Sequence, residues 1–339
     1  MRRGPPFFIR ALTGFFRPRN TILGMDFAGE VEAVGADVTL FRPGDRVFGL
    51  SPDSYGAHAE YLCVHEKGAV AAMPAGLRFA ECVLCEGAWY ANTYLEEFAL
   101  RAGQSILIYG ASGAIGTAAV QLAKARGAEV TAVVSTRHME LVKRLGADHA
   151  IDFTTEDFTA VGRTFDFVFD AVGKTSYFAC RPLLQPRGRF SATDLGPWWQ
   201  NIWLPVWMSV TGSRRVTFPM PRCSKALIEF IRTRMDAGQL RAVIDRSYGL
   251  DDIVAEVMDK SLDGMIVSNT TLSRAGIARD PGEAGGYLRK RLIRSRVARL
   301  SSGLGAAAGS GGRLKRSRPD RRDASSRNSP VRSSFPFSL

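Results

Sequence analysis

The chain has 339 residues, which is room for about two domains, and 45% of them are hydrophobic, which is enough to bury a core. Its formal net charge is +12, but residues 287–339 hold 14 of the 45 Lys and Arg and two of the 33 acidic residues, which leaves 31 of each kind in residues 1–286. The body of the chain is therefore neutral, which argues against a nucleic-acid-binding surface.

No signal peptide is predicted, because prolines and Arg10 interrupt the apolar segment that a signal sequence needs. The five cysteines form no disulfide framework and fit a reducing compartment, so we predict a cytoplasmic protein. Cys82 and Cys85 have the spacing of metal ligands, but a zinc site needs further Cys or His ligands nearby. We interpret both as small buried thiols on a helix and expect no metal site.

The N-terminal part of the chain is rich in β-structure signals. Strands are predicted at 27–35, 45–50 and 55–64, and residues 42–45 contain Pro and Gly where a turn needs them.

From about residue 83 the pattern changes to alternating helices and strands. Helices are predicted at 84–99, 114–126, 138–146 and 175–184, and strands at 105–110, 129–134, 149–151, 165–171 and 188–193. This alternation is typical of a parallel sheet. The strands are apolar almost throughout, as expected when helices cover both faces of the sheet.

The longest uncharged segment is 195–213, which is near the length of a membrane span. Its two prolines, Gln200 and Asn201 argue against a span. We predict instead that this aromatic segment is a lid or a contact between subunits.

Residues 223–237 have the apolar spacing of an amphipathic helix that Gly238 ends, and 242–260 predict a strand and a further helix. Beyond residue 286 the periodicity is lost apart from 288–300, which has the pattern of a basic amphipathic helix. We predict that 287–339 is a disordered, solvated tail. Nucleic-acid or acidic-membrane binding by the tail is less favoured, because few aromatic residues interleave with its charges.

A glycine-rich turn between a predicted strand and a predicted helix is the clearest functional signal. A helix start offers unpaired N–H groups and a partial positive charge to an anion. Gly113 would let a pyrophosphate approach the backbone, Gly116 would let the helix pack on the strand, and Ala111 holds the place of the first glycine of a dinucleotide fingerprint. The predicted cofactor-binding residues are Ala111, Ser112, Gly113, Ala114, Ile115 and Gly116. A packing turn without a ligand remains the alternative.

The next strand ends at Ser135, Thr136 and Arg137, where an NAD site usually has an acidic residue. An arginine beside two hydroxyls would hold a 2′-phosphate, so we predict NADPH as the cofactor. Arg137 as a solvated residue of a first helical turn is the other interpretation.

A second loop follows the buried strand 165–171 and contains Asp170, Val172 and Gly173. Ligands bind at the carboxyl ends of parallel strands, so this loop should border the nicotinamide. The same residues would also suit a simple strand-to-helix turn.

These motifs resemble the quinone oxidoreductase (zeta-crystallin-like) branch of the medium-chain dehydrogenases/reductases. The matching segments are "GMDFAGEVEAVGADVTLFRPGDRV" (24–47), "EGAWYA" (86–91), "GQSILIYGASGAIGTAAVQLAK" (103–124), "LGADHAIDF" (145–153), "FDFVFDAVG" (165–173) and "VIDRSYGLDDI" (243–253). The resemblance covers about residues 1–255 and departs at Ala114, where that branch has a second glycine. It implies a GroES-like β domain followed by a Rossmann domain, and it implies a homodimer.

The resemblance also implies a reaction. Met25 stands where zinc-dependent relatives have a histidine ligand, and a thioether is a poor zinc ligand. The chain is therefore similar to the zinc-free branch, which reduces small-molecule quinones or α,β-unsaturated carbonyls with NADPH. Tyr90 stands near the nicotinamide, where its hydroxyl could donate to the substrate carbonyl, and a packing role stays open. Phe153 replaces a tyrosine near the adenosine phosphate, whereas Asp26 and His58 are expected to be structural.

Both ends depart from the family pattern. The predicted organisation is a partial GroES-like domain lacking its first strands (1–82), a Rossmann domain (83–220), a return segment packing on the GroES-like domain (221–262), a fragment resembling dihydroorotate dehydrogenase (263–286) and the basic tail (287–339). Asn269 would be a ligand residue in such a fragment, but two dozen residues cannot form a barrel, so we assign no flavin site. A fused or mispredicted reading frame is the simplest explanation.

Two functions follow from these observations. The first is a zinc-independent, NADPH-dependent reductase. The second is a truncated or fused pseudoenzyme that binds NADPH without turnover.

Overall fold

A computed structural model of the chain describes residues 22, 24–210, 212, 215–245 and 247, together with the backbone of 270–271. Most of the segment 242–260, in which a strand and a helix are predicted, lies outside the described side chains, as do the fragment 263–286 and the basic tail 287–339.

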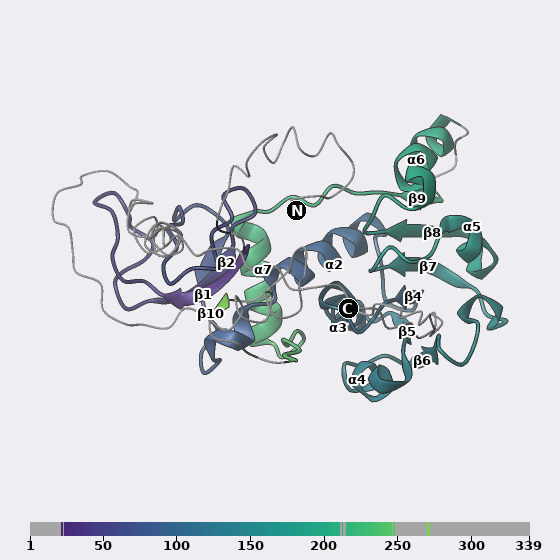
Figure 1. The fold of residues 1–339 in the computed structure, drawn as a ribbon, viewed down its shortest axis with the longest axis horizontal. Coiled ribbons are helices and arrows are strands. Elements are labelled where there is room, and N and C mark those ends of the chain that lie inside the picture. Colours follow the sequence, from purple (N-terminus) through teal and green to yellow (C-terminus); the bar gives the residue numbers. More distant parts are fainter. Residues whose placement is uncertain are drawn as a thin grey trace, which may run out of the picture. The chain divides into compact units, whose positions relative to one another are not determined.

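The centre of the described chain is a six-stranded parallel sheet (Figure 1). Its strands lie in the order β6 (His149–Asp152), β5 (Glu129–Val134), β4 (Ser105–Tyr109), β7 (Phe165–Asp170), β8 (Leu184–Ala192) and β9 (Val216–Thr217). The chain starts in the middle of the sheet and winds outward on both sides, with a crossing point between β4 and β7. This confirms the predicted doubly wound parallel sheet.

Helices cover both faces of this sheet because its strands are apolar on both sides. Successive residues of β4 show this: Ile106 and Ile108 join a core with the helices α2 (Cys85–Glu97) and α3 (Ala114–Ala125), whereas Leu107 joins the opposite core. In Figure 1, α3 and α5 lie on opposite sides of the row of strands. The other helices are α4 (Met139–Arg144), α5 (Tyr177–Cys180), α6 (Gln200–Val210) and α7 (Lys225–Asp236).

The N-terminal part forms a second sheet. Its strands are β1 (Asp26–Glu30), β2 (Arg46–Leu50), β3 (Val70–Ala72) and β10 (Thr270–Thr271), in the order β10-β1-β2-β3. The pairs β1–β2 and β2–β3 are antiparallel. Phe27, Val47, Ala57 and Val70 form a small core on it.

Helix α7 packs against β3 and α2. Ser224 caps it by accepting a hydrogen bond from the Leu227 amide, and Gly238 ends it in the left-handed conformation (φ +67°). The ammonium group of Lys225 donates to the Glu66 carbonyl oxygen at 3.0 Å, which links α7 to the loop before β3.

One predicted strand is wrong, and one predicted helix is shorter and less regular than expected. Residues 55–64 form no strand, since Tyr55 and Gly56 have positive φ and the Ala57 amide donates to the Gly24 carbonyl oxygen instead of to a neighbouring strand. The helix predicted at 175–184 consists of a single α-turn and a 3-10 turn, because Pro182 follows and strand β8 already begins at Leu184. Residues 242–245, the described start of the segment 242–260 in which a strand and a helix are predicted, have no regular structure, and nearly all of the rest of that segment lies outside the described residues.

Candidate cofactor-binding site

The loop after β4 explains why an alanine replaces the first fingerprint glycine. The left-handed backbone conformation falls on Gly110 (φ +75°), so position 111 is free to carry a side chain. The Ala111 methyl group is fully buried in the core. A β-carbon on Gly110 would collide with Val172 of the neighbouring loop.

Gly113 and Gly116 have different surroundings. A β-carbon on Gly116 would lie 2.6 Å from Ala111 Cα and against the Gly110 carbonyl oxygen, so the helix packs on its own loop only with glycine there. A β-carbon on Gly113 would meet only the Gly110 carbonyl oxygen, at an ordinary 3.6 Å. The protein's own packing does not require glycine at position 113, and this leaves room for a group from outside.

Helix α3 starts directly at this space. Gly113 is its N-cap and offers no side chain to the first N–H groups of the helix. The N–H groups at the start of α3 therefore have the arrangement that binds phosphates.

The loop after β7 lies beside the loop after β4. Tyr109 and Asp170 are partners in the β4–β7 register, and the Ala171 amide donates to the Tyr109 carbonyl oxygen at 3.0 Å. Val172 lies over Gly110, and its side chain is partly exposed. Gly173 has φ +70° and packs against Asp194, where a β-carbon would lie 2.6 Å from the Asp194 Cβ atom. The two predicted loops thus form one edge of the sheet.

Asp170 is fully buried and shapes its own loop. Its Oδ1 atom accepts the amides of Val172 (3.0 Å) and Gly173 (2.8 Å), and its Oδ2 atom accepts the Thr175 amide (2.8 Å). Burial raises the pKa of this carboxyl group, and the three N–H donors oppose that shift. Both oxygens of Asp170 hold the turn in place.

The residues at the end of β5 lie beside an acidic residue that the sequence analysis missed. Thr136 and Arg137 are exposed in a 3-10 turn, and the Ser135 hydroxyl contacts His138 Nδ1 at 3.2 Å. The Thr136 hydroxyl donates to Asp152 at the end of β6, at 2.5 Å. Hydrogen bonds from threonine hydroxyls lower the pKa of Asp152, so it is charged at neutral pH. Asp152 is 16 positions from Thr136 in the sequence, so only the fold brings it near the 3-10 turn that holds Thr136.

A cavity of about 440 Å³ opens at the same edge of the sheet. It is lined by Tyr109 and by residues 153–158. The ring centroids of Phe153 and Phe158 lie 6.0 and 4.9 Å from that of Tyr109, so the cavity has aromatic walls.

Helix α2, which carries Tyr90, contacts the start of α3. Gly87 of α2 touches Ala114, the first residue of α3, since a β-carbon on Gly87 would lie 2.5 Å from the Ala114 carbonyl oxygen. Tyr90 lies one turn further along α2 and is half-buried. Burial, Glu86 and Tyr55 raise the pKa of its phenol, so Tyr90 is a neutral donor at physiological pH.

The positions around Met25 carry a buried acid and buried thiols. Asp26 accepts the Glu86 amide at 2.9 Å, and burial raises the pKa of its carboxyl group well above the usual value. Cys82 and Cys85 are buried as expected, and burial raises the pKa of Cys82 to about 11. Among the described residues, no group of three or more His, Cys, Asp or Glu side chains is arranged to hold a metal ion.

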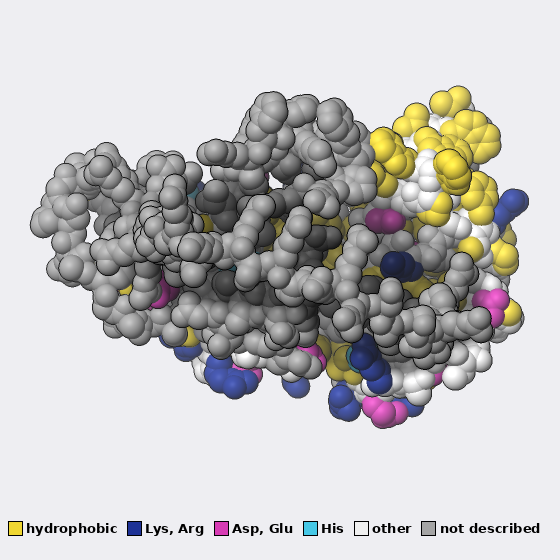
Figure 2. All heavy atoms as spheres, in the orientation of Figure 1, with side chains coloured by type: hydrophobic (Ala, Val, Ile, Leu, Met, Phe, Trp, Pro, Cys, Tyr) yellow, Lys and Arg dark blue, Asp and Glu magenta, His cyan; other side chains and the backbone are white. Residues whose placement is uncertain are grey.

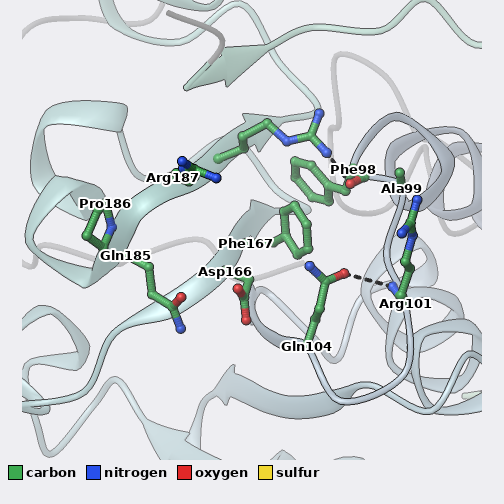
Figure 3. Close-up of a pocket in the computed structure, with 10 residues that line it drawn as sticks. Phe98, Ala99, Arg101, Gln104, Asp166, Phe167, Gln185, Pro186 and Arg187 are labelled. Carbon is green, nitrogen blue, oxygen red and sulfur yellow. Dashed lines mark hydrogen bonds between the residues drawn. The ribbon is translucent and has the colours of Figure 1, made fainter.

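A second cavity, of about 630 Å³, lies elsewhere (Figure 3). Its walls include Arg101, Gln104, Asp166 and Arg187, which flank the amino ends of β4 and β7 and the start of β8. Arg189 crosses above its two phenylalanines and donates to carbonyl oxygens at the end of α2. Because ligands of such sheets bind at the carboxyl ends, we do not assign the cofactor to this cavity.

The N-terminal β-rich part and the parallel-sheet part of the chain both match known protein families. Residues 8–75 match the alcohol dehydrogenase GroES-like domain family, and residues 145–263 match the zinc-binding dehydrogenase family. Trans-enoyl reductase pgmF of Aspergillus terreus is 34% identical over 252 residues, which are 68% of this chain and 70% of that protein. The NADPH-dependent alkenal/one oxidoreductase of Arabidopsis thaliana chloroplasts is 38% identical over 166 residues, 46% of this chain and 43% of that protein.

A solved structure, the quinone oxidoreductase from Coxiella burnetii, has a TM-score of 0.64 and 26% identity, and the match covers 80% of this chain and 83% of that chain. The fold, the glycine-rich loop at the end of β4 and the similarity over most of the chain all indicate the same family. The chain is an oxidoreductase that belongs to the medium-chain dehydrogenase/reductase superfamily, in its quinone oxidoreductase branch.

Proposed function

We propose that this protein transfers a hydride from NADPH to a quinone or an α,β-unsaturated carbonyl, without a zinc ion. The names of the similar proteins support this substrate class, since they are an enoyl reductase, an alkenal/one oxidoreductase and a quinone oxidoreductase. Met25 in the histidine position supports a reaction without zinc.

The space at Gly113 is the observation that carries the proposal. Gly110 and Gly116 are required by contacts within the protein, whereas Gly113 faces open space at the start of α3. A pyrophosphate there would accept hydrogen bonds from the amides of Ala114, Ile115 and Gly116 in the first turn of α3, whereas the Gly113 amide donates to the Gly110 carbonyl oxygen. The fold thus fits a dinucleotide through residues that it does not need for its own packing.

Each predicted residue then has a role. When bound, the nicotinamide supplies the hydride. Val172 and Gly173 border it and exclude water from one side, in a loop that Asp170 holds rigid. Tyr90 donates a hydrogen bond to the substrate oxygen and so stabilises the negative charge that develops there.

The choice between NADPH and NADH depends on the positive charge of Arg137 and the negative charge of Asp152. We propose that Ser135, Thr136 and Arg137 hold the 2′-phosphate of NADPH, and that the adenine occupies the aromatic cavity beside Tyr109. Asp152 lies beside Thr136 and would repel that phosphate, but its carboxylate is engaged by Thr136 and Thr154.

The test is NADPH oxidation followed at 340 nm with a quinone and an enone. We expect Arg137→Ala to raise KM for NADPH about tenfold and to leave KM for NADH unchanged, the loss expected for a charged hydrogen bond to phosphate. Arg144→Ala, another exposed arginine at the end of α4, is the matched control. An unchanged NADPH preference in Arg137→Ala would remove that residue from the proposal.

Tyr90→Phe tests the catalytic step separately. We expect kcat to fall about tenfold with KM for the cofactor unchanged, because a single transition-state hydrogen bond is lost. An unchanged kcat would leave Tyr90 a packing role. Wild-type protein that binds NADPH but reduces no quinone or enone would establish the pseudoenzyme instead.

Two further features remain proposals. We propose a homodimer, for which the edge strand β9 offers a backbone edge, and equilibrium sedimentation tests it. No disulfide joins cysteines of the described residues, which supports a reducing compartment, and we propose the cytoplasm.

A further inference from the structure

Helix α6 presents apolar side chains to solvent along its whole length. Ile202, Trp203, Val206, Trp207 and Val210, which we call the α6 stripe, recur at the spacing of one helix face. Val206, Trp207 and Val210 are 65, 59 and 85% exposed, and the neighbouring Trp198 is 92% exposed. Figure 2 shows this as a hydrophobic region over α6, at the upper right of the view.

The opposite face of α6 already has its partners. Leu204 and Met208 are buried in the same core as Val216 of β9. Asn201 is fully buried, and its side-chain amide donates to the Asp194 carbonyl oxygen at 2.9 Å. The helix is therefore anchored on the protein through one face, and the α6 stripe is a second apolar face, which is exposed in the described part of the chain.

The backbone before α6 is strained. Trp198 and Trp199 both have left-handed backbone angles (φ 55° and 58°), which are uncommon for bulky residues. Such conformations persist where other interactions hold them, and they are concentrated at functional segments. Here the side chain of Trp203 donates from Nε1 to the Trp198 carbonyl oxygen at 3.1 Å. The strained backbone at Trp198 and Trp199 therefore occurs where the indole rings of tryptophans are exposed to solvent.

The composition of the segment indicates which kind of partner fits. Tryptophan is enriched where a bilayer meets water, since its ring is apolar and its N–H group is polar. No charged residue occurs from Leu195 to Ser213, and four of the five tryptophans of the chain lie there. The helix has 11 residues, too few to cross a bilayer but enough to lie in its surface. No helix in the described part of the chain has the length and hydropathy of a membrane span.

The basic charge near the C-terminus of the chain also favours binding to a bilayer surface. Residues 287–339 hold 14 basic and two acidic residues, and such segments are attracted to anionic lipids. Stable attachment to a membrane generally takes two signals, for example an apolar insertion and a polybasic segment. The sequence provides one of each.

We propose that the α6 stripe inserts into the interfacial region of a lipid bilayer, with the basic C-terminal residues adding attraction to anionic headgroups. This binding does not depend on the proposed hydride transfer.

The experiment uses the full chain and intrinsic tryptophan emission. Vesicles of phosphatidylcholine alone and of phosphatidylcholine with 30% phosphatidylglycerol are added in turn, and flotation measures the bound fraction. We expect the emission to shift to shorter wavelength and to be quenched by brominated lipid. Binding should be stronger to the vesicles that contain phosphatidylglycerol. Salt at 0.5 M should remove this difference between the two vesicle compositions, whereas the binding that comes from insertion of the apolar side chains should remain.

The variant Trp203→Ser/Trp207→Ser should lower the partition coefficient by about tenfold or more, because two indoles no longer enter the lipid. Phe178→Ser, which removes an exposed aromatic ring from α5, is the matched control and should bind as the wild type does. Circular dichroism establishes that each variant is folded.

Two results would overturn the proposal. One is the absence of flotation and of any emission shift with both vesicle compositions. The other is a dimer, measured by equilibrium sedimentation without lipid, that Trp203→Ser/Trp207→Ser dissociates. The α6 stripe would then be a contact between two copies of the chain.

Discussion

Gly116 and Gly113 are three residues apart and give opposite predictions. In Gly116→Ala the new methyl group would lie 2.6 Å from Ala111 Cα and against the Gly110 carbonyl oxygen. Both neighbours are backbone atoms, which cannot rotate away. Overpacking of this kind costs about 1–3 kcal/mol, and rigid neighbours favour the upper value. At roughly 2–4 °C per kcal/mol for a protein of this size, Tm should fall by about 6–12 °C.

In Gly113→Ala the methyl group would meet one atom at 3.6 Å. The loss of glycine at the N-cap changes stability by about 1 kcal/mol at most, so Tm should stay within about 4 °C of the wild type. The methyl group does occupy the space in front of the α3 N–H groups, and we expect the NADPH affinity to fall tenfold or more.

Thermal denaturation with and without NADPH measures both quantities. Gly116→Ala with an unchanged Tm would contradict the packing argument. Gly113→Ala that still binds NADPH as tightly as wild type would show that the phosphate does not bind at the start of α3.

Three further outcomes follow from buried groups. Because burial raises the pKa of Asp26, its folded state holds the proton more tightly than the unfolded state, and the contribution of Asp26 to stability should fall as pH rises above about 4. Asp26→Asn should therefore gain Tm relative to wild type between pH 4 and pH 8, and a constant difference would refute this. Tyr94→Phe removes a buried 3.0 Å hydrogen bond to the Ala192 carbonyl oxygen and should lower stability by about 1–2 kcal/mol in chemical denaturation; equal stability would show that the bond contributes nothing. Gly87→Ala should lower both Tm and NADPH affinity, and a loss of only one would argue that the contact with Ala114 does not support the loop.

The sheet could be predicted because its signals are local. Strands such as 105–109 and 129–134 are short, apolar and bounded by glycines and polar turns, and the helices between them have small residues at their packing positions. The alternation of these signals determines a parallel sheet whatever the details of the loops. The predicted strands agree with β4 and β5 to within one residue.

The errors occurred where a local pattern needed a distant partner. Ala57 and Ala59 are buried as in a strand, but the backbone turns at Tyr55 and Gly56, and the Ala59 amide donates to the nearby Ala57 carbonyl oxygen. The aromatic segment 195–213 contains a helix that was not predicted, because Pro205 and the bulky side chains hide its pattern. That this segment is a lid or a subunit contact stays a prediction.

The candidate site was predictable in part for the same reason. The glycine-rich loop and the loop at Asp170 are each one short continuous segment of the sequence, and the two loops are adjacent in the structure. Whether they bind NADPH stays a prediction. Asp152 and Gly87 were missed because each acts on a residue far along the chain, Thr136 in one case and Ala114 in the other.

The contact of Gly87 with Ala114 has a consequence for changing this protein by design. No larger side chain fits at position 87 while α2 stays against the start of α3, and Tyr90 lies one turn further along α2. A substitution of Gly87 would therefore displace the helix that carries Tyr90. Efforts to admit bulkier molecules should leave this helix contact as it is and vary side chains elsewhere.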